Sequence, residues 1–402
     1  MTLPLEGVRV ADFTWVWAGP HCTLQLTHLG AEVIRVESAS RTCVTRLLPP
    51  FADAQPGRNR SGYFNQYNQG KLSLALDLKH PEALAVARDL VVQCDIVCEN
   101  FAAGVMTRMG LGYDVLRQQR PGLIMIALSG YGATGPESQF VSYGPAQVPL
   151  SGLSSLTGYA DWPPMHVGIS YGDPNGGAHG AVAVLAALLH RDATGEGQYI
   201  DLSQWETSIA VLGEGVLEQS LTGAQPARCG NRDPHMAPHG VFRCAGEQRW
   251  AAIAARDDAD WRRLAALIDP TLVTDARFAT LENRKANEDA LETVVTSWTQ
   301  TQAADAVVER LQAARIPASV AMSNKDLSED PQLAASEFFV HHEHPEVGAR
   351  LHLGIPWTMS DTPCHVRSAA PCLGQHTDDV LSRVLGYDAP HIAALHAAGV
   401  LA

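Results

Sequence analysis

The sequence has 402 residues, enough for two domains of roughly 150 residues each, and its 46% hydrophobic content can fill a large core. The formal net charge of −14 argues against nucleic acid as a partner, because binding a phosphate backbone needs a basic face. The sequence has no apolar run of about 18 residues and no basic-then-apolar N-terminus, so we expect no membrane span and no secretory signal. The eight cysteines are scattered, which is typical of free thiols in a cytoplasmic protein.

Short apolar runs alternate with segments of helical pattern along the first half of the chain. Strands are predicted at residues 7–13, 31–37, 72–77, 95–98, 123–128 and 199–202. Helices are predicted at residues 22–29, 81–92, around Leu116, at 176–191 and at 205–217. This alternation predicts an α/β fold with a doubly wound, mostly parallel sheet.

A change of pattern after residue 221 predicts a second, smaller domain. Residues 1–221 are expected to belong to a large domain, and residues 222–236, rich in Gly, Pro and Arg, to a linker. Residues 237–325 are expected to form an α+β domain, with a strand at 250–254 and helices near Trp261 and at 303–314. Residues 330–402 are expected to hold a second linker, turns and a final helix near 378–385.

Several familiar motifs of phosphate binding and catalysis are missing from the sequence. No G-x-G-x-x-G follows the first strand, and no P-loop or G-x-S-x-G occurs, which argues against dinucleotide binding, nucleotide hydrolysis and a serine hydrolase. The histidine-rich run Val340-His-His-Glu-His344 lacks the spacing that places two histidines on one helix face. We therefore expect a solvated loop there and no metal.

Asp173, in the run Gly172-Asp-Pro-Asn-Gly-Gly177, is expected to stand just before a helix, with Pro174 in its first turn. Such an aspartate is often no more than an N-cap. Two features favour a chemical role. The glycines leave the backbone bare for a bulky ligand, and a helix N-terminus favours an anionic carboxylate and can hold a developing oxyanion.

A series of sequence segments, which occur in a fixed order along the chain, favours the chemical role of Asp173 over that of an N-cap. The chain opens with Leu5-Glu-Gly-Val-Arg-Val-Ala-Asp-Phe13, Ala18-Gly-Pro20 and Leu29-Gly-Ala-Glu-Val-Ile-Arg-Val-Glu37. It continues with Lys71-Leu-Ser-Leu-Ala-Leu-Asp77, Val97-Cys-Glu-Asn-Phe101, Arg108-Met-Gly-Leu-Gly112, Gly130-Tyr-Gly-Ala-Thr-Gly-Pro136, residues 172–177 and Thr194-Gly-Glu-Gly-Gln198. Together these segments resemble the class III CoA-transferases, which include formyl-CoA transferase and the CaiB/BaiF group, over nearly the whole chain.

The resemblance implies a fold and a chemistry that the residue patterns alone do not. It implies a large domain formed by both ends of the chain, so that residues 330–402 return to it, and an interlocked homodimer. It implies that Asp173 attacks an acyl-CoA thioester, giving a mixed anhydride and then an aspartyl-CoA thioester. A carboxylate suits this chemistry, because both intermediates keep the carboxyl carbon activated. The substrates would be an acyl-CoA and a carboxylic acid, with no cofactor.

The resemblance also implies which residues bind CoA. They are Trp17, Ala18, Leu76, Lys79, Asn100, Phe101 and Arg108. The two cations among them are physically sensible phosphate partners on an acidic protein. One departure from the family is Ser38, which stands where formyl-CoA transferase has an arginine; Arg41 is a partial substitute.

Further departures bear on the substrate. Formyl-CoA transferase has glutamine at the position of Trp17 and glutamate at that of Gly144, so we expect an acceptor larger or more apolar than formate or oxalate. The run Asp12–Pro20 resembles the benzylsuccinate CoA-transferase group, and Trp15 is expected in the core. One rival is a 2-methylacyl-CoA racemase, which needs a histidine about thirty residues before the aspartate as its second base. In this sequence Tyr143 occupies that place; it is a candidate substrate-binding residue, but a phenol is a poor base near pH 7. The other rival is a non-catalytic subunit of a two-subunit transferase.

Overall fold

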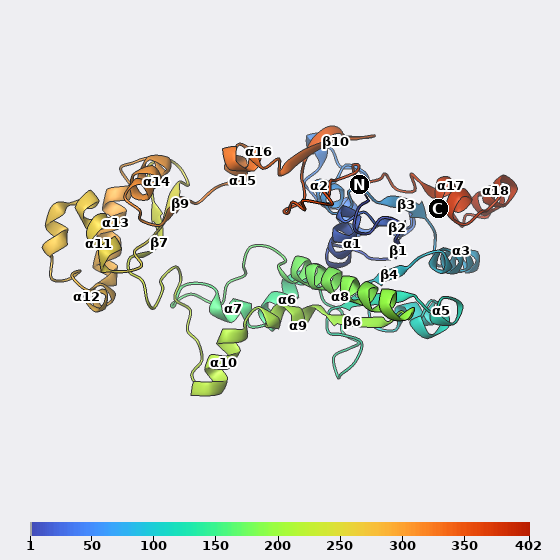
Figure 1. Ribbon diagram of the computed structural model, residues 1–402, viewed down its shortest axis with the longest axis horizontal. Helices are drawn as coiled ribbons and strands as arrows, with labels where there is room; N and C mark the ends of the chain where they lie inside the picture. Colours follow the sequence, from blue (N-terminus) through green and yellow to red (C-terminus); the bar gives the residue numbers. More distant parts are fainter. Residues whose placement is uncertain (1) are drawn as a thin grey trace. The chain divides into compact units, whose positions relative to one another are not determined.

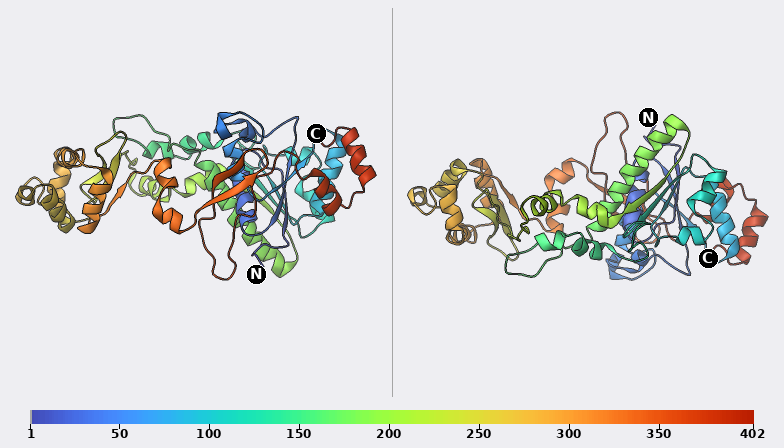
Figure 2. Two further views of the ribbon diagram at one scale, coloured as in Figure 1. Left: turned by 90° about the horizontal axis from the view of Figure 1, so that it is seen from above. Right: turned by 90° about the horizontal axis from the view of Figure 1, so that it is seen from below.

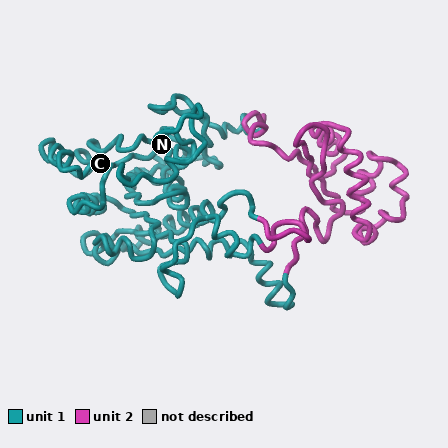
Figure 3. The backbone as a smooth tube through the Cα atoms, turned by 180° about the vertical axis from the view of Figure 1, so that it is seen from behind, with its two compact units in different colours: residues 1–154, 166–225, 332–402 teal, residues 155–165, 226–331 magenta. Residues whose placement is uncertain are grey.

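The computed structural model describes residues 2–402 and divides them into two compact units (Figures 1 and 3). The large unit comprises residues up to Ser154, His166–Gln225 and Gln332–Ala402. The small unit comprises Ser155–Met165 and Pro226–Pro331. Both ends of the chain therefore lie in the large unit, as the family resemblance implied.

A six-stranded parallel sheet forms the centre of the large unit. Its strands, in spatial order, are β3 (Leu72–Ala75), β2 (Glu32–Glu37), β1 (Arg9–Asp12), β4 (Ile96–Glu99), β5 (Ile124–Ser129) and β6 (Tyr199–Ser203). Val10 of β1 pairs with Val33 on one side and with Ile96 on the other. The chain thus winds in one direction from β1 and in the opposite direction from β4, which confirms the predicted doubly wound α/β fold.

Helices cover both faces of this sheet (Figure 2). On one face α1 (Ala18–His28) and α8 (Gly172–Thr194) bury Leu26 and Val184 against Ile126 of β5. On the other face lie α3 (Pro81–Val92), α5 (Tyr113–Gln119), the π-helical segment η4 (Val380–Val384) and α18 (Ala389–Ala397), which share a second apolar cluster. The C-terminal residues thus complete the core of the large unit, and their apolar side chains would otherwise be exposed.

Shorter elements complete the large unit. They are η1 (Val44–Leu47), η2 (Ala52–Ala54), α2 (Gly62–Tyr67), α4 (Val105–Arg108), α6 (Gly144–Leu150), α9 (Gln204–Ala210), α10 (Gly213–Thr222), the β10–β11 hairpin (Phe339–His344 and Gly348–Leu353) and α17 (Thr377–Asp379). Helices α7 (Leu153–Leu156) and α16 (Pro331–Ala335) fall at the boundaries between the units. Within residues 2–402 no helix is long and apolar enough to span a membrane.

The small unit has its own antiparallel sheet and core. The strands β7 (His239–Arg243), β8 (Trp250–Ala254) and β9 (Ala318–Val320) pair in that order. Its helices are α11 (Asp258–Ile268), η3 (Pro270–Thr274), α12 (Leu281–Ala286), α13 (Glu288–Thr299), α14 (Ala304–Ala313) and α15 (Asn324–Ser328). Trp261 and Phe278 lie at the centre of its core, 5.7 Å apart and edge to face.

Four local predictions are corrected by the structure. Helix α8 begins at Gly172 rather than at Gly176, so Asp173 lies inside its first turn instead of before it. The histidine-rich run is strand β10 and not a loop, because each of its residues pairs with β11. The helix expected at 205–217 is two helices that meet near Gly213, and a further helix, α18, follows the one expected near 378–385.

The glycines of α8 allow it to pack closely against α1. A Cβ on Gly177 would lie 2.6 Å from the carbonyl oxygen of Ala18, so α1 and α8 cross closely only because no side chain stands there. Glycine is normally unfavourable inside a helix by about 1 kcal/mol relative to alanine. Here the close packing of the two helices overrides that preference, and the pattern indicates helix packing rather than a turn.

Candidate active site

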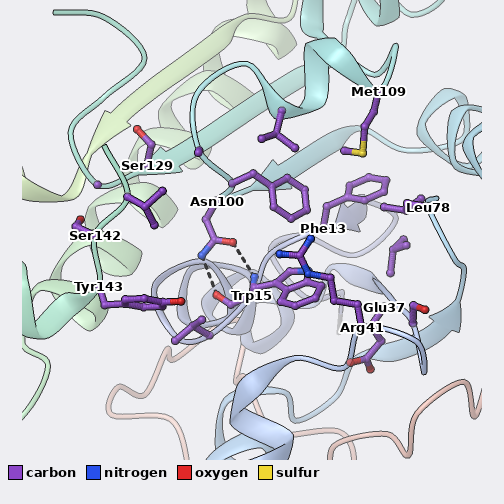
Figure 4. Close-up of a pocket in the computed structure, with 18 of the residues that line it drawn as sticks. Phe13, Trp15, Glu37, Arg41, Leu78, Asn100, Met109, Ser129, Ser142 and Tyr143 are labelled. Carbon is purple, nitrogen blue, oxygen red and sulfur yellow. Dashed lines mark hydrogen bonds between the residues drawn. The ribbon is translucent and has the colours of Figure 1, made fainter. Parts of the chain in front are cut away.

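A cavity of about 410 Å³ opens at the carboxyl ends of the parallel strands in the large unit (Figure 4). Glu37 from the end of β2, Asn100 from just after β4 and Ser129 from the end of β5 all line it. Ligands of doubly wound sheets bind at this edge, where the winding direction reverses between two strands. Asp173, on the first turn of α8, lines the same cavity.

The Asp173 side chain is held at the start of two other helices. The residue is 6% exposed, and its carboxylate accepts hydrogen bonds from the backbone N–H groups of Ala18 and Gly144. These are the first residues of α1 and α6, where backbone N–H groups have no partner within their own helix. Burial raises the pKa of Asp173 to about 7, although both hydrogen bonds oppose the shift.

Gly144 provides the space that this carboxylate occupies. A Cβ on Gly144 would lie 2.6 Å from Cγ of Asp173 and 2.9 Å from Cβ of Ser170, both far inside van der Waals contact. The Asp173 carboxylate therefore lies directly against the backbone of α6. Any side chain at position 144 would require Asp173 to move.

Asp173 differs from the other carboxylates that line the cavity, Glu37 and Asp77. Burial alone would raise the pKa of Glu37, but Arg35 and Arg46 outweigh burial, and its pKa lies below the usual range. Asp77 accepts a hydrogen bond from the Ser40 hydroxyl at 3.0 Å. Among residues 2–402, Asp173 makes no ion pair, so its carboxylate is buried, uncompensated by a cation and open to the cavity.

An unusual turn connects β1 to α1 at the edge of the cavity. Val16 has a φ of 63°, a left-handed conformation that a β-branched residue rarely adopts. Its N–H donates to Sγ of Cys43 at 3.3 Å. Asn100 fixes the neighbouring Trp15 twice: its Oδ1 accepts from the Trp15 N–H at 2.7 Å, and its Nδ2 donates to the Trp15 carbonyl at 2.8 Å. Such strain of about 1–3 kcal/mol is typical of functional sites.

The two tryptophans on either side of Val16 lie differently with respect to the cavity. Trp15, expected in the core, lines the cavity, whereas Trp17 is not among the lining residues. The Trp17 ring instead packs against Tyr67 and Tyr63, with centroids 5.0 and 5.7 Å away. Burial and the charge of Asp173 raise the pKa of Tyr63, so its hydroxyl stays protonated.

The other residues that the sequence pointed to divide into two groups. Leu76, Lys79, Asn100, Phe101, Tyr143 and Asp173 line one cavity, and Ala18 reaches it through its N–H bond to Asp173. Arg108 ends α4 and is not among the lining residues, although Val105 of the same helix is.

The sequence did not indicate several residues that line the cavity, among them Val16, Glu37, Ser129, Ser142 and Gln204. Glu37 ends a predicted strand and Ser129 directly follows one, so the rule that ligands bind at the carboxyl ends of strands could have identified both.

Comparison with known proteins agrees with this architecture. The sequence profile of CoA-transferase family III matches residues 5–377. A succinyl-CoA–D-citramalate CoA-transferase of Chloroflexus aurantiacus is 32% identical over 99% of this chain and 98% of its own length. A formyl-CoA:oxalate CoA-transferase of Rhodopseudomonas palustris is 32% identical over 100% of this chain and 98% of its own.

A solved structure gives the same result for the fold. The crystal structure of a CAIB/BAIF family protein from Brucella suis covers 96% of this chain and 100% of its own, with a TM-score of 0.88 and 29% identity. The family profile and the relatives each span almost the whole chain, which confirms the resemblance drawn from the sequence. The chain belongs to CoA-transferase family III and is a CoA-transferase.

Proposed function

We propose that the enzyme moves CoA from an acyl-CoA to a carboxylic acid, with Asp173 as the nucleophile. The observation that carries this proposal is a buried carboxylate that faces the cavity, has no cationic partner among residues 2–402 and is held by two backbone N–H groups. A carboxylate paired with a cation would be a weaker nucleophile, as Glu37 would be.

The reaction then proceeds through covalent intermediates on Asp173. A carboxylate oxygen attacks the thioester carbon, the C–S bond breaks, and CoA thiolate leaves behind a mixed anhydride. The thiolate attacks the Asp173 carbonyl carbon, releasing the first acid and forming an aspartyl-CoA thioester. The acceptor carboxylate attacks that carbon and displaces the thiolate, which finally attacks the acceptor's carbonyl carbon. This last step forms the new acyl-CoA and restores Asp173.

The hydrogen bonds from Ala18 and Gly144 gain a role in this sequence. When thiolate or acceptor carboxylate attacks the Asp173 carbonyl carbon, negative charge develops on its remaining oxygen. The two N–H groups are already bonded to this carboxyl before the charge forms. Preorganised donors of this kind contribute on the order of 10²–10³-fold each in other acyl-transfer enzymes.

We further propose an acceptor that is larger or more apolar than formate or oxalate. Val16, Phe140, Val141 and Tyr143 line the cavity, and the basic residues lining it among residues 2–402 are Arg41 and Lys79. The relatives named above act on citramalate and oxalate, both dicarboxylic acids. The apolar side chains favour a monocarboxylic acid with a hydrocarbon or aromatic tail.

A matrix of donors and acceptors tests this function. The purified enzyme is incubated with succinyl-CoA or an aromatic acyl-CoA, each with formate, oxalate, succinate, benzoate or phenylacetate, and new CoA thioesters are quantified by mass spectrometry. We expect transfer, with kcat/KM at least about tenfold higher for aromatic acids than for oxalate. Transfer confined to formate and oxalate would disprove the acceptor class, and no transfer with any pair would disprove the function.

The racemase alternative lacks a suitable second base. Tyr143, at the position of the racemase histidine, is 61% exposed, and none of the histidines among residues 2–402 lines the cavity. Burial, followed by the charge of Lys71, lowers the pKa of His21 to about 4, which makes its imidazole a weak base. Incubation of a 2-methylacyl-CoA in deuterated water distinguishes the two activities, because a racemase exchanges the α-proton and a transferase does not.

We also propose that the enzyme is a homodimer, as the family resemblance implies. Large apolar side chains are exposed on α8 and α10 of the large unit: Val182, Leu189, Leu217 and Leu221 are 67%, 73%, 59% and 81% exposed. Such side chains are costly to leave in water and are typical of surfaces between subunits. Sedimentation over a thousandfold dilution is expected to show a dimer throughout, and a stable, active monomer would contradict this proposal.

A cytoplasmic location is the remaining proposal. All eight cysteines are free in the part of the chain that the structure describes, which suits a reducing compartment. Cell fractionation with immunodetection checks this location.

A further inference from the structure

We infer that Lys71 is a positioning residue for the proposed reaction: it holds the start of α1 so that the Ala18 N–H meets the Asp173 carboxylate. This inference rests on the proposed function, because it assumes that Asp173 is the nucleophile. Lys71 stands just before β3, and its side chain is wholly buried. It is not among the residues that line the cavity, so it can act on the reaction only through other residues.

The Lys71 ammonium contacts both the start of α1 and the end of β1. Its Nζ donates to the Pro20 carbonyl at 3.1 Å and to Oγ1 of Thr23 at 2.7 Å, both on α1. It also forms an ion pair with Asp12, the last residue of β1, in which Nζ lies 3.1 Å from Oδ2. A fourth acceptor is Oδ1 of Asn68, just after α2, at 3.0 Å. One buried cation therefore joins β1, α1 and the end of α2.

Asp12 extends this connection across the turn between β1 and α1. Its Oδ2 accepts from the Thr23 hydroxyl at 2.8 Å, and its Oδ1 accepts from the Thr14 N–H at 2.9 Å. Thr14 in turn packs against Gly19, because a Cβ on Gly19 would collide with the Thr14 side chain. The buried pair of Lys71 and Asp12 therefore holds the turn on both sides, at Thr14 before it and in the first turn of α1 after it.

The turn needs such support because it is strained and carries one of the two N–H groups bonded to Asp173. Val16 has a φ of 63°, and Ala18, two residues later, donates its N–H to the Asp173 carboxylate. A strained backbone persists only where the surrounding contacts over-determine it. Lys71 and Asp12 supply several of these contacts. This role accounts for the burial of two charges that would be better solvated at the surface.

Lys71→Met tests this inference through the pH dependence of adduct formation on Asp173. Methionine donates no hydrogen bond, so the start of α1 is free to shift and the bond from the Ala18 N–H weakens. That bond lowers the pKa of Asp173, so the pH midpoint of adduct formation is expected to move upward from about 7 by about one unit. The rate of adduct formation with succinyl-CoA is measured by mass spectrometry after rapid quenching at a series of pH values. We expect kcat to fall by about 10- to 100-fold.

Thr23→Val is a second test, which leaves both buried charges in place. Valine removes the hydroxyl that accepts from Lys71 and donates to Asp12, so the midpoint is expected to shift in the same direction by a smaller amount. This variant decides the question if Lys71→Met fails to fold, because Lys71→Met takes from Asp12 its nearest cation and is the more disruptive change.

The matched control is a buried threonine of the small unit. Thr299 is fully buried like Thr23, and its hydroxyl donates to the Arg243 carbonyl at 2.7 Å. Thr299→Val is expected to lower the free energy of unfolding while it leaves the pH midpoint and kcat unchanged. The comparison separates an effect on the start of α1 from a general loss of stability.

The outcomes also separate this inference from the proposed function. An unchanged midpoint in Thr23→Val and in folded Lys71→Met would overturn the inference while the function stands, even if kcat fell, because the loss would not pass through the Ala18 bond. An equal shift in Thr299→Val would overturn it as well. An unmodified enzyme that forms no adduct on Asp173 with succinyl-CoA or an aromatic acyl-CoA would instead overturn the proposed nucleophile.

Discussion

Asp173→Ala is expected to abolish CoA transfer, by on the order of 10⁴-fold or more, while the protein folds normally. The carboxyl carbon of Asp173 carries each proposed intermediate, and alanine has nothing that could form an anhydride. We expect the variant to fold, because this carboxylate makes no ion pair within residues 2–402 and its two hydrogen bonds come from the starts of helices that are packed by other residues. Its pKa is raised by burial, so ionised Asp173 destabilises the folded state, and the free energy of unfolding at pH 8 is expected to be unchanged or higher in the variant.

Trapping the covalent intermediate is expected to identify the residue that carries it. Unmodified enzyme incubated with acyl-CoA alone is expected to accumulate an adduct that hydroxylamine converts to a hydroxamate, and peptide mapping is expected to place it on Asp173. Only the ionised carboxylate attacks, so adduct formation is expected to slow as the pH falls through about 7. Asp173→Asn keeps the shape of the side chain and is expected to form no adduct.

A matched control lies on the same helix. Asp192 is near the far end of α8, its side chain is 71% exposed, and it lies 3.7 Å from Arg191. Asp192→Ala is expected to retain full activity, because exposed pairs of this kind contribute little. Full transfer by Asp173→Ala would refute the proposed mechanism and leave Asp173 a structural residue of the first turn of α8.

Much of the fold could be predicted because its strands are buried on both faces. Residues 123–128 form a continuous apolar run, which is typical of a strand in a covered parallel sheet, and residues 31–37 place Val33, Ile34 and Val36 among charged residues. The helix at 81–92 was predicted with its observed limits, since Pro81 at its first position and the preceding His80, whose side chain accepts from the Glu82 N–H, define its start. In contrast, β10 contains three histidines and pairs in a two-stranded hairpin, so no apolar pattern marks it as a strand.

The site was harder to predict because its geometry depends on contacts between distant segments. Asp173 could be identified from its own glycine-rich surroundings and the family resemblance. Nothing in the sequence indicates that Val16 adopts a positive φ, or that Trp15 before it lines the cavity while Trp17 after it does not. Position 144 was interpreted as free space for an acceptor. The structure fills part of that space with the Asp173 carboxylate, a contact between residues that are far apart in the sequence.

Gly144→Ala is therefore expected to reduce kcat by about 100-fold or more with one added methyl group. The new Cβ would lie 2.6 Å from Cγ of Asp173, so the carboxylate must leave its position and lose the hydrogen bond from the residue 144 N–H. A displacement of about 1 Å at a reacting group costs on the order of 10²-fold in rate. Alanine favours helix more than glycine does, so α6 itself is not weakened.

The control substitutes a glycine in the same kind of position. Gly213 is the first residue of α10, as Gly144 is of α6, and no described atom lies within 4 Å of a Cβ built there, apart from its chain neighbours and its own helix. Gly213→Ala is expected to keep normal kcat, and circular dichroism is expected to show both variants folded. If Gly144→Ala transferred CoA at the normal rate, Asp173 would have to react from a different position, and the two N–H groups would lose their proposed role. A reduced kcat with an unchanged Kd for CoA would instead place the whole effect on the proposed nucleophile, because the added methyl group lies against Asp173.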